Sequence, residues 1–481
     1  MANLRNNFIY QTLYQLLATA IPLITSPYLS RVLGAEQLGV YSYISTVANY
    51  FTVLASLGIG THATRYIAAC SSEERDIAYR EIRCLQIFLS SIMSLAYVLF
   101  VALTVTEHCT IYYIQVIWII ATGIDVTWYF GGLQEFKITV TRNLIIKIIT
   151  ILGIFTLVKS KEDVAIYALM LTLGTLGSNA YLIIMAHTRV KKCKIRLKGV
   201  LKHLKPAALL FVPFLGMTVY HQMDKVMLGS IGTYSDVGLY YNADKIVNIL
   251  IGIITGFGTV SMPRVTQLLV NGDMKEYEML LKKSVSLIMF ICSACVFGIS
   301  AVSSVFVPLF FGEEFVGAIP LVSILSFVMY FKAGSTIARS EYLIPMGFNK
   351  IYIYSTFLGA LVNLVANYLF ITRYGALGAA YGTMAAEAFV TIYQFHYMNK
   401  SIDIFNIIAS NWIYVCGGLI MYAIVRLVPY LIDGPIVITL LIQIAVGGII
   451  FFAFCIVVWN ITKDKIVWPI VRGYLRKVLD K

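Results

Sequence analysis

Eleven ionisable side chains lie inside or at the ends of long apolar stretches of this sequence, where a charge is costly unless it faces water or a partner. The cations are Arg31, Lys147, Lys225, Lys245, Lys332 and Arg339. The acids are Asp125, Asp224, Asp244, Glu341 and Glu387. The set is too large to serve packing alone, so we expect a water-filled cavity that these side chains line.

The spacing of these residues suggests separate kinds of chemistry. Lys332 and Arg339 are seven residues apart and therefore share one face of a helix, which predicts a site for an anionic ligand. Glu387 lies well inside an apolar run and is the best candidate for a carboxylate that carries a coupling proton. For Arg31 and Glu341 an alternative stays open, in which each sits at a helix end and reaches water.

Two acid–base neighbours, Asp224 with Lys225 and Asp244 with Lys245, are adjacent in the chain. Neighbouring residues point about 100° apart on a helix, so neither pair closes on itself. We expect each side chain to find another partner or water. Lys147 stands near the start of its apolar run, and a simple marker of the inner helix end is the alternative for it.

The elements that would hold these residues are membrane-spanning helices. The 481 residues are 59% hydrophobic and 13% charged, about half the charged share of a soluble protein. Long charge-free stretches occur at Asn6–Ser30, Leu38–Thr61, Cys84–Thr106, Val164–Ala186, Ser284–Gly312, Ile351–Thr372, Ile404–Val425 and Gly434–Thr462. Six further apolar runs carry a few charges, near 111–132, 143–158, 206–230, 235–263, 315–343 and 374–397. The sequence therefore predicts an all-α polytopic membrane protein with about 14 spans.

The orientation follows from the loops. With the N-terminus in the cytoplasm, the inside loops and the tail carry 27 of the 37 Lys and Arg residues. This asymmetry predicts that both termini are cytoplasmic. The net charge of +13 then lies at the inner leaflet, where anionic lipid explains it without nucleic acid. The loop 188–205 has eight basic residues and no acid; it is either a lipid-facing linker or a docking site for an acidic headgroup or partner.

Two similar segments indicate an internal repeat. Arg31–Gly34 followed by Leu38–Tyr41 resembles Lys225–Gly229 followed by Val237–Tyr240. We expect an N-terminal lobe at 1–187 with helices 1–6, a basic linker at 188–205, a C-terminal lobe at 206–400 with helices 7–12, and helices 13–14 with a basic tail at 401–481. The ligand site would lie between the lobes. Pro22 and Pro27 predict kinks in helix 1, and Pro213 predicts one in helix 7.

Enzyme chemistry finds little support in the sequence. The loops are short, and no phosphate-binding glycine loop or activated nucleophile is recognisable. The eight cysteines are scattered, and only Cys292 and Cys295 are close, without the four ligands that a zinc site needs. We expect a transporter, no resident metal and no cofactor.

Several motifs, taken in order, resemble those of one family of transporters. They are Ser26–Gly34, Leu38–Tyr41, Leu57–Gly60, Arg65–Ala68, Asp125–Phe130, Gly132–Lys137, Thr141–Asn143, Asp224–Lys225, Leu228–Gly229, Gly238–Tyr240, Phe311–Phe315 and Gly375–Gly382. The chain resembles the Wzx-type lipid-linked oligosaccharide flippases, polysaccharide transporters of the multidrug/oligosaccharidyl-lipid/polysaccharide exporter superfamily. The resemblance extends over essentially the whole chain.

The resemblance implies a function and a setting. A flippase of this kind carries an undecaprenyl-pyrophosphate oligosaccharide from the inner to the outer leaflet of the bacterial cytoplasmic membrane by alternating access. It serves the biosynthesis of capsule, O-antigen or another cell-surface polysaccharide, next to membrane lipids and polysaccharide polymerase or assembly proteins. A gradient of H⁺ or Na⁺ would drive it. By position, the cavity set would be Arg31, Asp125, Lys147, Asp224, Lys225, Lys332, Arg339 and Glu387.

Two other readings compete with this one. An ion-coupled multidrug antiporter of the same superfamily shares the two lobes and exports organic cations through an acid-rich cavity. The balance of acids and bases does not separate the two readings, whereas the 125–142 segment favours the flippase. A polysaccharide polymerase or glycosyltransferase would need a sizeable catalytic loop, which the sequence lacks.

Overall fold

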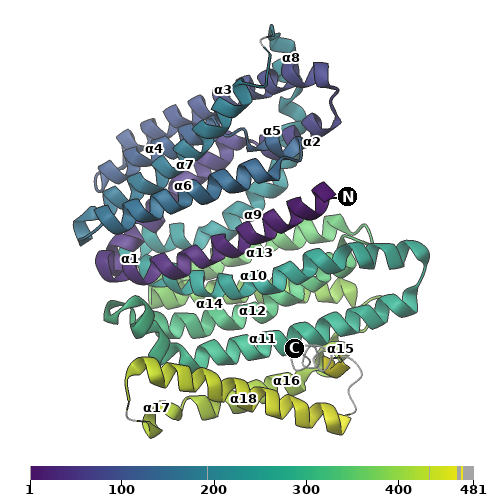
Figure 1. Ribbon diagram of the computed structural model, residues 1–481. Coiled ribbons are helices and arrows are strands. Elements are labelled where there is room, and N and C mark those ends of the chain that lie inside the picture. The colour runs from purple at the N-terminus through teal and green to yellow at the C-terminus, as the bar shows by residue number, and fades with distance from the viewer. Residues whose placement is uncertain (1, 192, 433, 463–466, 470–481) are drawn as a thin grey trace. The chain divides into compact units, whose positions relative to one another are not determined.

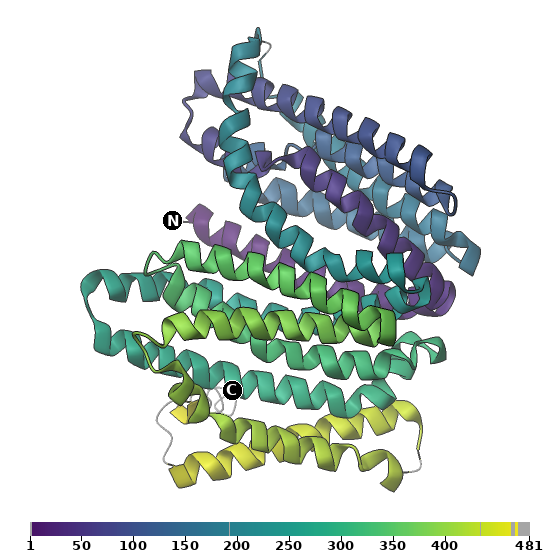
Figure 2. The same ribbon diagram turned by 180° about the vertical axis from the view of Figure 1, so that it is seen from behind.

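The computed structural model describes residues 2–191, 193–432, 434–462 and 467–469, and every regular element within them is helical. Figures 1 and 2 show the chain from opposite sides. The predicted all-α class is thereby confirmed. Contacts divide the chain into two compact units, which we term the N-terminal unit (Met1–Gly238) and the C-terminal unit (Leu239–Lys481).

The N-terminal unit is a bundle in which α3, α4, α6 and α7 lie side by side (Figure 1). Its helices are α1 (Ala2–Ser56), α2 (Ile59–Ala69), α3 (Ser72–Thr104), α4 (Cys109–Gly123), α5 (Thr127–Gly132), α6 (Phe136–Leu157), α7 (Val164–His187), α8 (Leu197–Lys202) and α9 (Leu204–Ile231). The path of α1 is broken at Gly34, whose φ of 74° favours glycine. The chain reverses there, so α1 supplies the first two predicted spans (Figure 1).

The C-terminal unit begins within α10 (Tyr234–Asn271). It continues with α11 (Met274–Phe311), α12 (Ala318–Ile337), a π-helical turn (Ala338–Leu343), α13 (Asn349–Tyr374), α14 (Ala376–Met398), α15 (Ile404–Ala409), α16 (Trp412–Val425), α17 (Val428–Leu431) and α18 (Ile436–Thr462). The helices α16 and α18 pack on α11 around a core that contains Phe290, Phe451 and Trp459 (Figure 2).

The spans agree closely with those expected. Within the described residues, eleven helices are long and apolar enough to cross a membrane, and a twelfth is a pair bent by 50°. Splitting α1 at Gly34 and adding α14, which is rich in small residues, accounts for all of the predicted spans. The bend in α9 lies between Phe211 and Phe214, where the sequence has Pro213, as its position predicts.

The two repeated segments meet at their glycines. A methyl group on Gly39 would collide with the carbonyl oxygen of Tyr234 and come within 2.9 Å of the nitrogen of Gly238. A methyl group on Gly238 would collide with the carbonyl oxygen of Ala35. The two backbones therefore cross at a distance that excludes larger side chains.

The position of α9 bears on the domain organisation. It follows the linker 188–205, but it packs against α1 and α2 and belongs to the N-terminal unit. Contacts report packing and not the repeat, so the lobe boundaries inferred from the sequence stay a prediction.

Candidate functional site

A polar pocket of about 390 Å³ lies in the N-terminal unit, lined by α1, α6, α7 and the segment between α4 and α5. It brings together Asp125 and Lys147, two of the residues singled out from the sequence. Arg142 joins them. Hydroxyl, phenol and amide groups complete its polar lining, from Thr25, Thr127, Asn143, Thr150, Tyr167, Thr175, Ser178 and Asn179.

Asp125 is held in a break between two helices. The side chain of Gln86 on α3 donates from Nε2 to the carbonyl oxygens of Thr122 (2.6 Å) and Asp125 (2.8 Å). In turn the indole Nε1 of Trp128 donates to Oε1 of Gln86 at 3.0 Å. The Asp125 carboxylate accepts from the backbone nitrogen of Thr127 at 2.8 Å and from its hydroxyl. Non-helical backbone at membrane depth needs such partners, and here they fix the acid at the edge of the pocket.

Arg142 is a residue of this pocket that the sequence reasoning missed. Its side chain is buried, and it donates from Nη1 to the carbonyl oxygen of Ser178 (2.8 Å) and from Nη2 to Oδ1 of Asn143 (2.7 Å). The predicted span began at 143, so Arg142 was assigned to an inside loop. The structure begins α6 at Phe136. The apolar Ile138 and Val140 just before Arg142 are the signal that could have placed it inside the helix.

Lys147 is half-buried on α6 and lies on the same pocket wall. Arg142 also lines a neighbouring pocket of about 410 Å³, together with Lys137 and Tyr181. The guanidinium therefore stands between two cavities along α6.

The other predicted residues of the N-terminal unit lie elsewhere. Arg31 is exposed on α1, Asp224 is buried on α9, and Lys225 is half-buried beside it. None of the three lines the polar pocket. Asp224 is close enough for its charge to act on the phenol of Tyr50 on α1.

In the C-terminal unit, Lys332 on α12 forms an ion pair with Glu387 on α14, with 3.9 Å between Nζ and Oε1. Glu387 is buried, whereas Lys332 is partly exposed. Arg339 stands 6.0 Å from the ring of Tyr352 on α13. The two cations that share a helix face by spacing thus contact different helices.

Glu341 lies in the π-helical turn and is only 1% exposed, so it does not reach water at a helix end. The hydroxyls of Ser261 and Ser284 are close to its carboxylate. The phenol of Tyr277 donates to its backbone carbonyl at 3.0 Å. Such π-helical turns often mark functional positions in helices.

Asp244 and Lys245 on α10 face different neighbours, as their adjacency predicts. Asp244 accepts from Nδ2 of Asn248 at 2.6 Å. The Lys245 ammonium stands 5.2 Å from the ring centre of Tyr241. Across the described residues, no group of three or more His, Cys, Asp or Glu side chains could hold a metal ion.

A bundle of apolar spans that carries cations, acids and a polar pocket at membrane depth defines a polytopic membrane transport protein. Residues 4–269, more than half of the chain, match the family described as polysaccharide biosynthesis protein. The chain belongs to this family.

Relatives are similar to this chain in sequence, and solved structures are similar to it in fold. A protein of Escherichia coli (strain K12), named as an O-antigen transporter, is 24% identical over 395 residues, which cover 81% of this chain and 95% of the relative. The fold is similar to that of the lipid II flippase MurJ in an inward closed conformation, with a TM-score of 0.74, 15% identity, and coverage of 95% of this chain and 100% of the other. An inward-facing multidrug resistance transporter of the MATE family has a TM-score of 0.56, 15% identity, and coverage of 80% and 95%.

Proposed function

We propose that this protein is a flippase that moves a lipid-linked oligosaccharide, undecaprenyl pyrophosphate with its sugar unit, from the inner to the outer leaflet by alternating access. The observation that carries the proposal is the polar pocket of the N-terminal unit, in which Arg142 and Lys147 lie among hydroxyl and amide groups. Membership of the family and the name of the Escherichia coli relative support the same class of cargo.

The chemistry of the pocket suits such a cargo. A pyrophosphate is recognised by cations, and a guanidinium presents a planar fork of donors to phosphate oxygens. Sugar hydroxyls both donate and accept, as do Thr150, Thr175 and Ser178 on the pocket wall. The prenyl chain needs no polar site, because it can remain in the bilayer. A cationic drug would gain nothing from Arg142.

For the energy source we propose that Glu387 binds the coupling ion, H⁺ or Na⁺. When Glu387 is neutralised by that ion, its attraction for Lys332 is lost and the ammonium is released to meet an anion. Glu387→Gln should therefore transport without responding to the gradient. Transport that still follows the gradient in this variant would rule the role out.

The setting that we propose is the bacterial cytoplasmic membrane, with both termini in the cytoplasm. There the released unit would pass to a polysaccharide polymerase for a surface polymer such as capsule or O-antigen. A tag at either end should be cleaved by a protease only in inverted vesicles; cleavage in right-side-out vesicles would reverse the orientation.

The experiment that tests the proposed function uses inverted vesicles with labelled lipid-linked oligosaccharide on their outward, cytoplasmic leaflet. Protein-dependent protection from an added glycosidase measures flipping, and ionophores in the same assay identify the coupling ion. Arg142→Gln with Lys147→Gln should lower the protection. The matched control, Lys159→Gln with Lys161→Gln, removes the same charge from an exposed turn and should behave as wild type.

The outcome separates this function from its rival. No protection by the wild-type protein with a matched lipid would contradict the flippase and favour the multidrug antiporter, which dye efflux would then test. Equal flipping by the pocket variant and the control would remove Arg142 and Lys147 from the site.

A further inference from the structure

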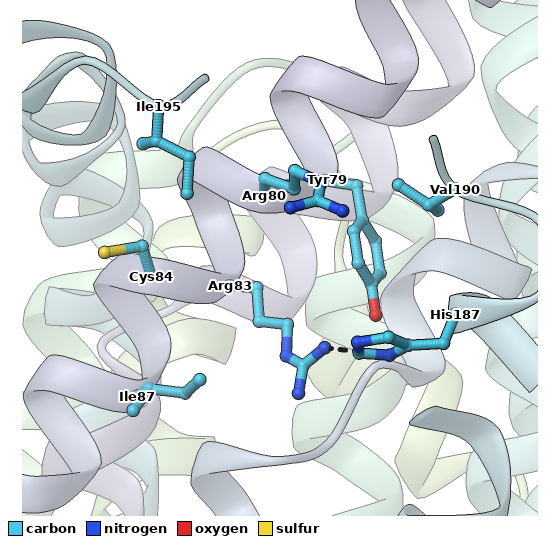
Figure 3. Close-up of a pocket in the computed structure, with 8 residues that line it drawn as sticks. All are labelled: Tyr79, Arg80, Arg83, Cys84, Ile87, His187, Val190 and Ile195. Carbon is cyan, nitrogen blue, oxygen red and sulfur yellow. Dashed lines mark hydrogen bonds between the residues drawn. The ribbon is translucent and has the colours of Figure 1, made fainter. Parts of the chain in front are cut away.

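A second cationic pocket lies in the N-terminal unit, between the first turns of α3, the end of α7 and the linker that follows (Figure 3). It has a volume of about 280 Å³. Arg80, Arg83 and His187 line it with nitrogen atoms, and Tyr79 contributes a phenol. No acid is among its lining residues.

The linker is tied over this pocket. Arg80 donates from Nε to the carbonyl oxygen of Lys191 at 3.0 Å, which holds the chain that carries Val190 and Ile195 against α3. The linker residues Lys194 and Arg196 are exposed nearby in the chain. The linker stretch that carries Ile195 is therefore basic, as is the wall of the pocket.

One polar atom at the pocket, Nε of Arg83, is buried without a hydrogen-bond partner among the described residues, and the hydroxyl of Tyr79 lies beside the Arg83 guanidinium. Tyr79 is only 2% exposed. Its ring is fixed by packing against Trp128 and Tyr129, with centroids 5.5 and 4.9 Å away. An orphaned buried donor is costly, so Nε of Arg83 points to an acceptor that the protein itself does not provide.

One ring nitrogen of His187 lies within hydrogen-bond distance of two different groups. This atom, Nδ1, lies 3.2 Å from Nη1 of Arg83 (Figure 3). The same atom lies 3.2 Å from the carbonyl oxygen of Ile183. One ring nitrogen cannot accept from the guanidinium and donate to the carbonyl at the same time. An anion that binds Arg83 would leave His187 free to donate to Ile183.

Next to the cations, the surface formed by α3 and α7 carries exposed apolar side chains. Ile87 forms part of the pocket and is 42% exposed, and Leu95, two turns further along the same face of α3, is 62% exposed. Ile184 on α7 is 66% exposed. In a membrane protein such a surface meets acyl chains, so a headgroup bound at the arginines would have its tails along α3.

We propose that this pocket binds the phosphate headgroup of an anionic phospholipid of the cytoplasmic leaflet, with Arg80, Arg83 and Tyr79 as the groups that hold it. Basic pockets at the cytoplasmic ends of membrane helices are suited to such headgroups. The pocket shares no lining residue with the polar pocket assigned to the cargo, so the lipid is a second ligand. The assignment does not depend on the proposed transport function.

The test uses Cys84, an exposed thiol that lines the pocket. The full-length protein is placed in vesicles of phosphatidylcholine with or without phosphatidylglycerol and treated with N-ethylmaleimide. Peptide mass spectrometry then gives the alkylation rate of Cys84 relative to that of Cys109 at the start of α4, which is not among the residues that line the pocket. Phosphatidylglycerol should slow Cys84 by about fivefold or more relative to this internal reference.

Variants separate the pocket from general surface charge. Each cation near an anionic lipid contributes about fivefold in affinity, so Arg80→Gln with Arg83→Gln should raise the phosphatidylglycerol content needed for protection by about 30-fold. The matched control, Lys198→Gln with Lys205→Gln, removes two exposed cations from the same end of the unit and should keep the protection. If the double arginine variant does not fold, Tyr79→Phe removes only the hydroxyl and should weaken protection about threefold.

Four results would overturn the proposal. The first is full protection of Cys84 in the arginine variant or, if that variant does not fold, in Tyr79→Phe, and the second is an equal loss of protection in the lysine control. The third is protection of Cys84 by inorganic phosphate alone. The fourth is protection by undecaprenyl pyrophosphate at the same content, which would assign the pocket to the cargo. Protection by phosphatidylglycerol, lost in the arginine variant and kept in the control, would support it.

Discussion

Replacing Gly39 with alanine tests the backbone crossing that joins the two repeats. The added methyl group would overlap the carbonyl oxygen of Tyr234 and stand 2.9 Å from the nitrogen of Gly238. Both obstacles are backbone atoms of another turn, so no side-chain rotation relieves them. The turn itself must move.

The expected size follows from two opposing effects. Forcing a methyl group into a well-packed site costs about 1–3 kcal/mol. Alanine in a helix recovers about 0.5–1 kcal/mol relative to glycine. The net loss is about 1–2 kcal/mol, which lowers the ratio of folded to unfolded protein about 5- to 30-fold.

The assay is the melting temperature of the purified protein in detergent, together with flipping in vesicles. The matched control is Gly177→Ala on α7, where an added methyl group meets nothing within 4 Å. We expect Gly39→Ala to melt lower than wild type and to transport at a different rate, and Gly177→Ala to melt at or slightly above wild type. If the two variants melt alike and transport alike, the crossing does not hold the structure as described.

Three further predictions concern the sites. Gln86→Leu leaves the indole N–H of Trp128 and the carbonyl group of Asp125 without the partner that Gln86 supplies, at about 1–3 kcal/mol each, and removes one of the donors to the carbonyl of Thr122, so the variant should melt several degrees lower; wild-type melting would refute the anchoring role. Lys332→Glu places two carboxylates at the contact with Glu387, and adding Glu387→Lys should restore part of the lost stability; simple additivity of the two changes would show that the pair is not coupled. Arg142→Lys keeps the charge but loses the planar fork, so its flipping rate should fall between those of wild type and Arg142→Gln.

The fold was largely predictable because hydropathy depends on composition, which the sequence states directly. The spans, the all-α class and the bend near Pro213 all follow from apolar runs and proline geometry. The exact start of a helix is a different matter. The apolar run around α6 is interrupted by Arg142, and one of the acceptors that allow the charge inside, the carbonyl oxygen of Ser178, lies 36 residues away in the chain. No local pattern contains that partner.

The candidate site shows the same limit: the sequence predicts which residues share a helix, but not which residues of other helices contact them. The seven-residue spacing of Lys332 and Arg339 assumes one regular α-helix, whereas Lys332 lies in α12 and Arg339 in the π-helical turn that follows it. The spacing also says nothing of the helices packed against this segment. Glu387 meets Lys332 from α14, and Tyr352 meets Arg339 from α13. In this structure Lys332 forms an ion pair and Arg339 an aromatic contact, and the anion site inferred for the two cations stays a prediction.

The repeat leads to a related argument about function. Its two copies share the glycines that let the backbones cross, Gly39 and Gly238. Their charged members differ, because Arg31 is exposed whereas Lys225 is half-buried next to the buried Asp224. The two copies thus share the glycines that allow two turns to pack closely, whereas their charged residues lie in different surroundings. The functional cations and acids of such a transporter therefore have to be identified one by one from their contacts. A match between the repeats predicts how the turns pack, but it does not predict the surroundings of a charged residue.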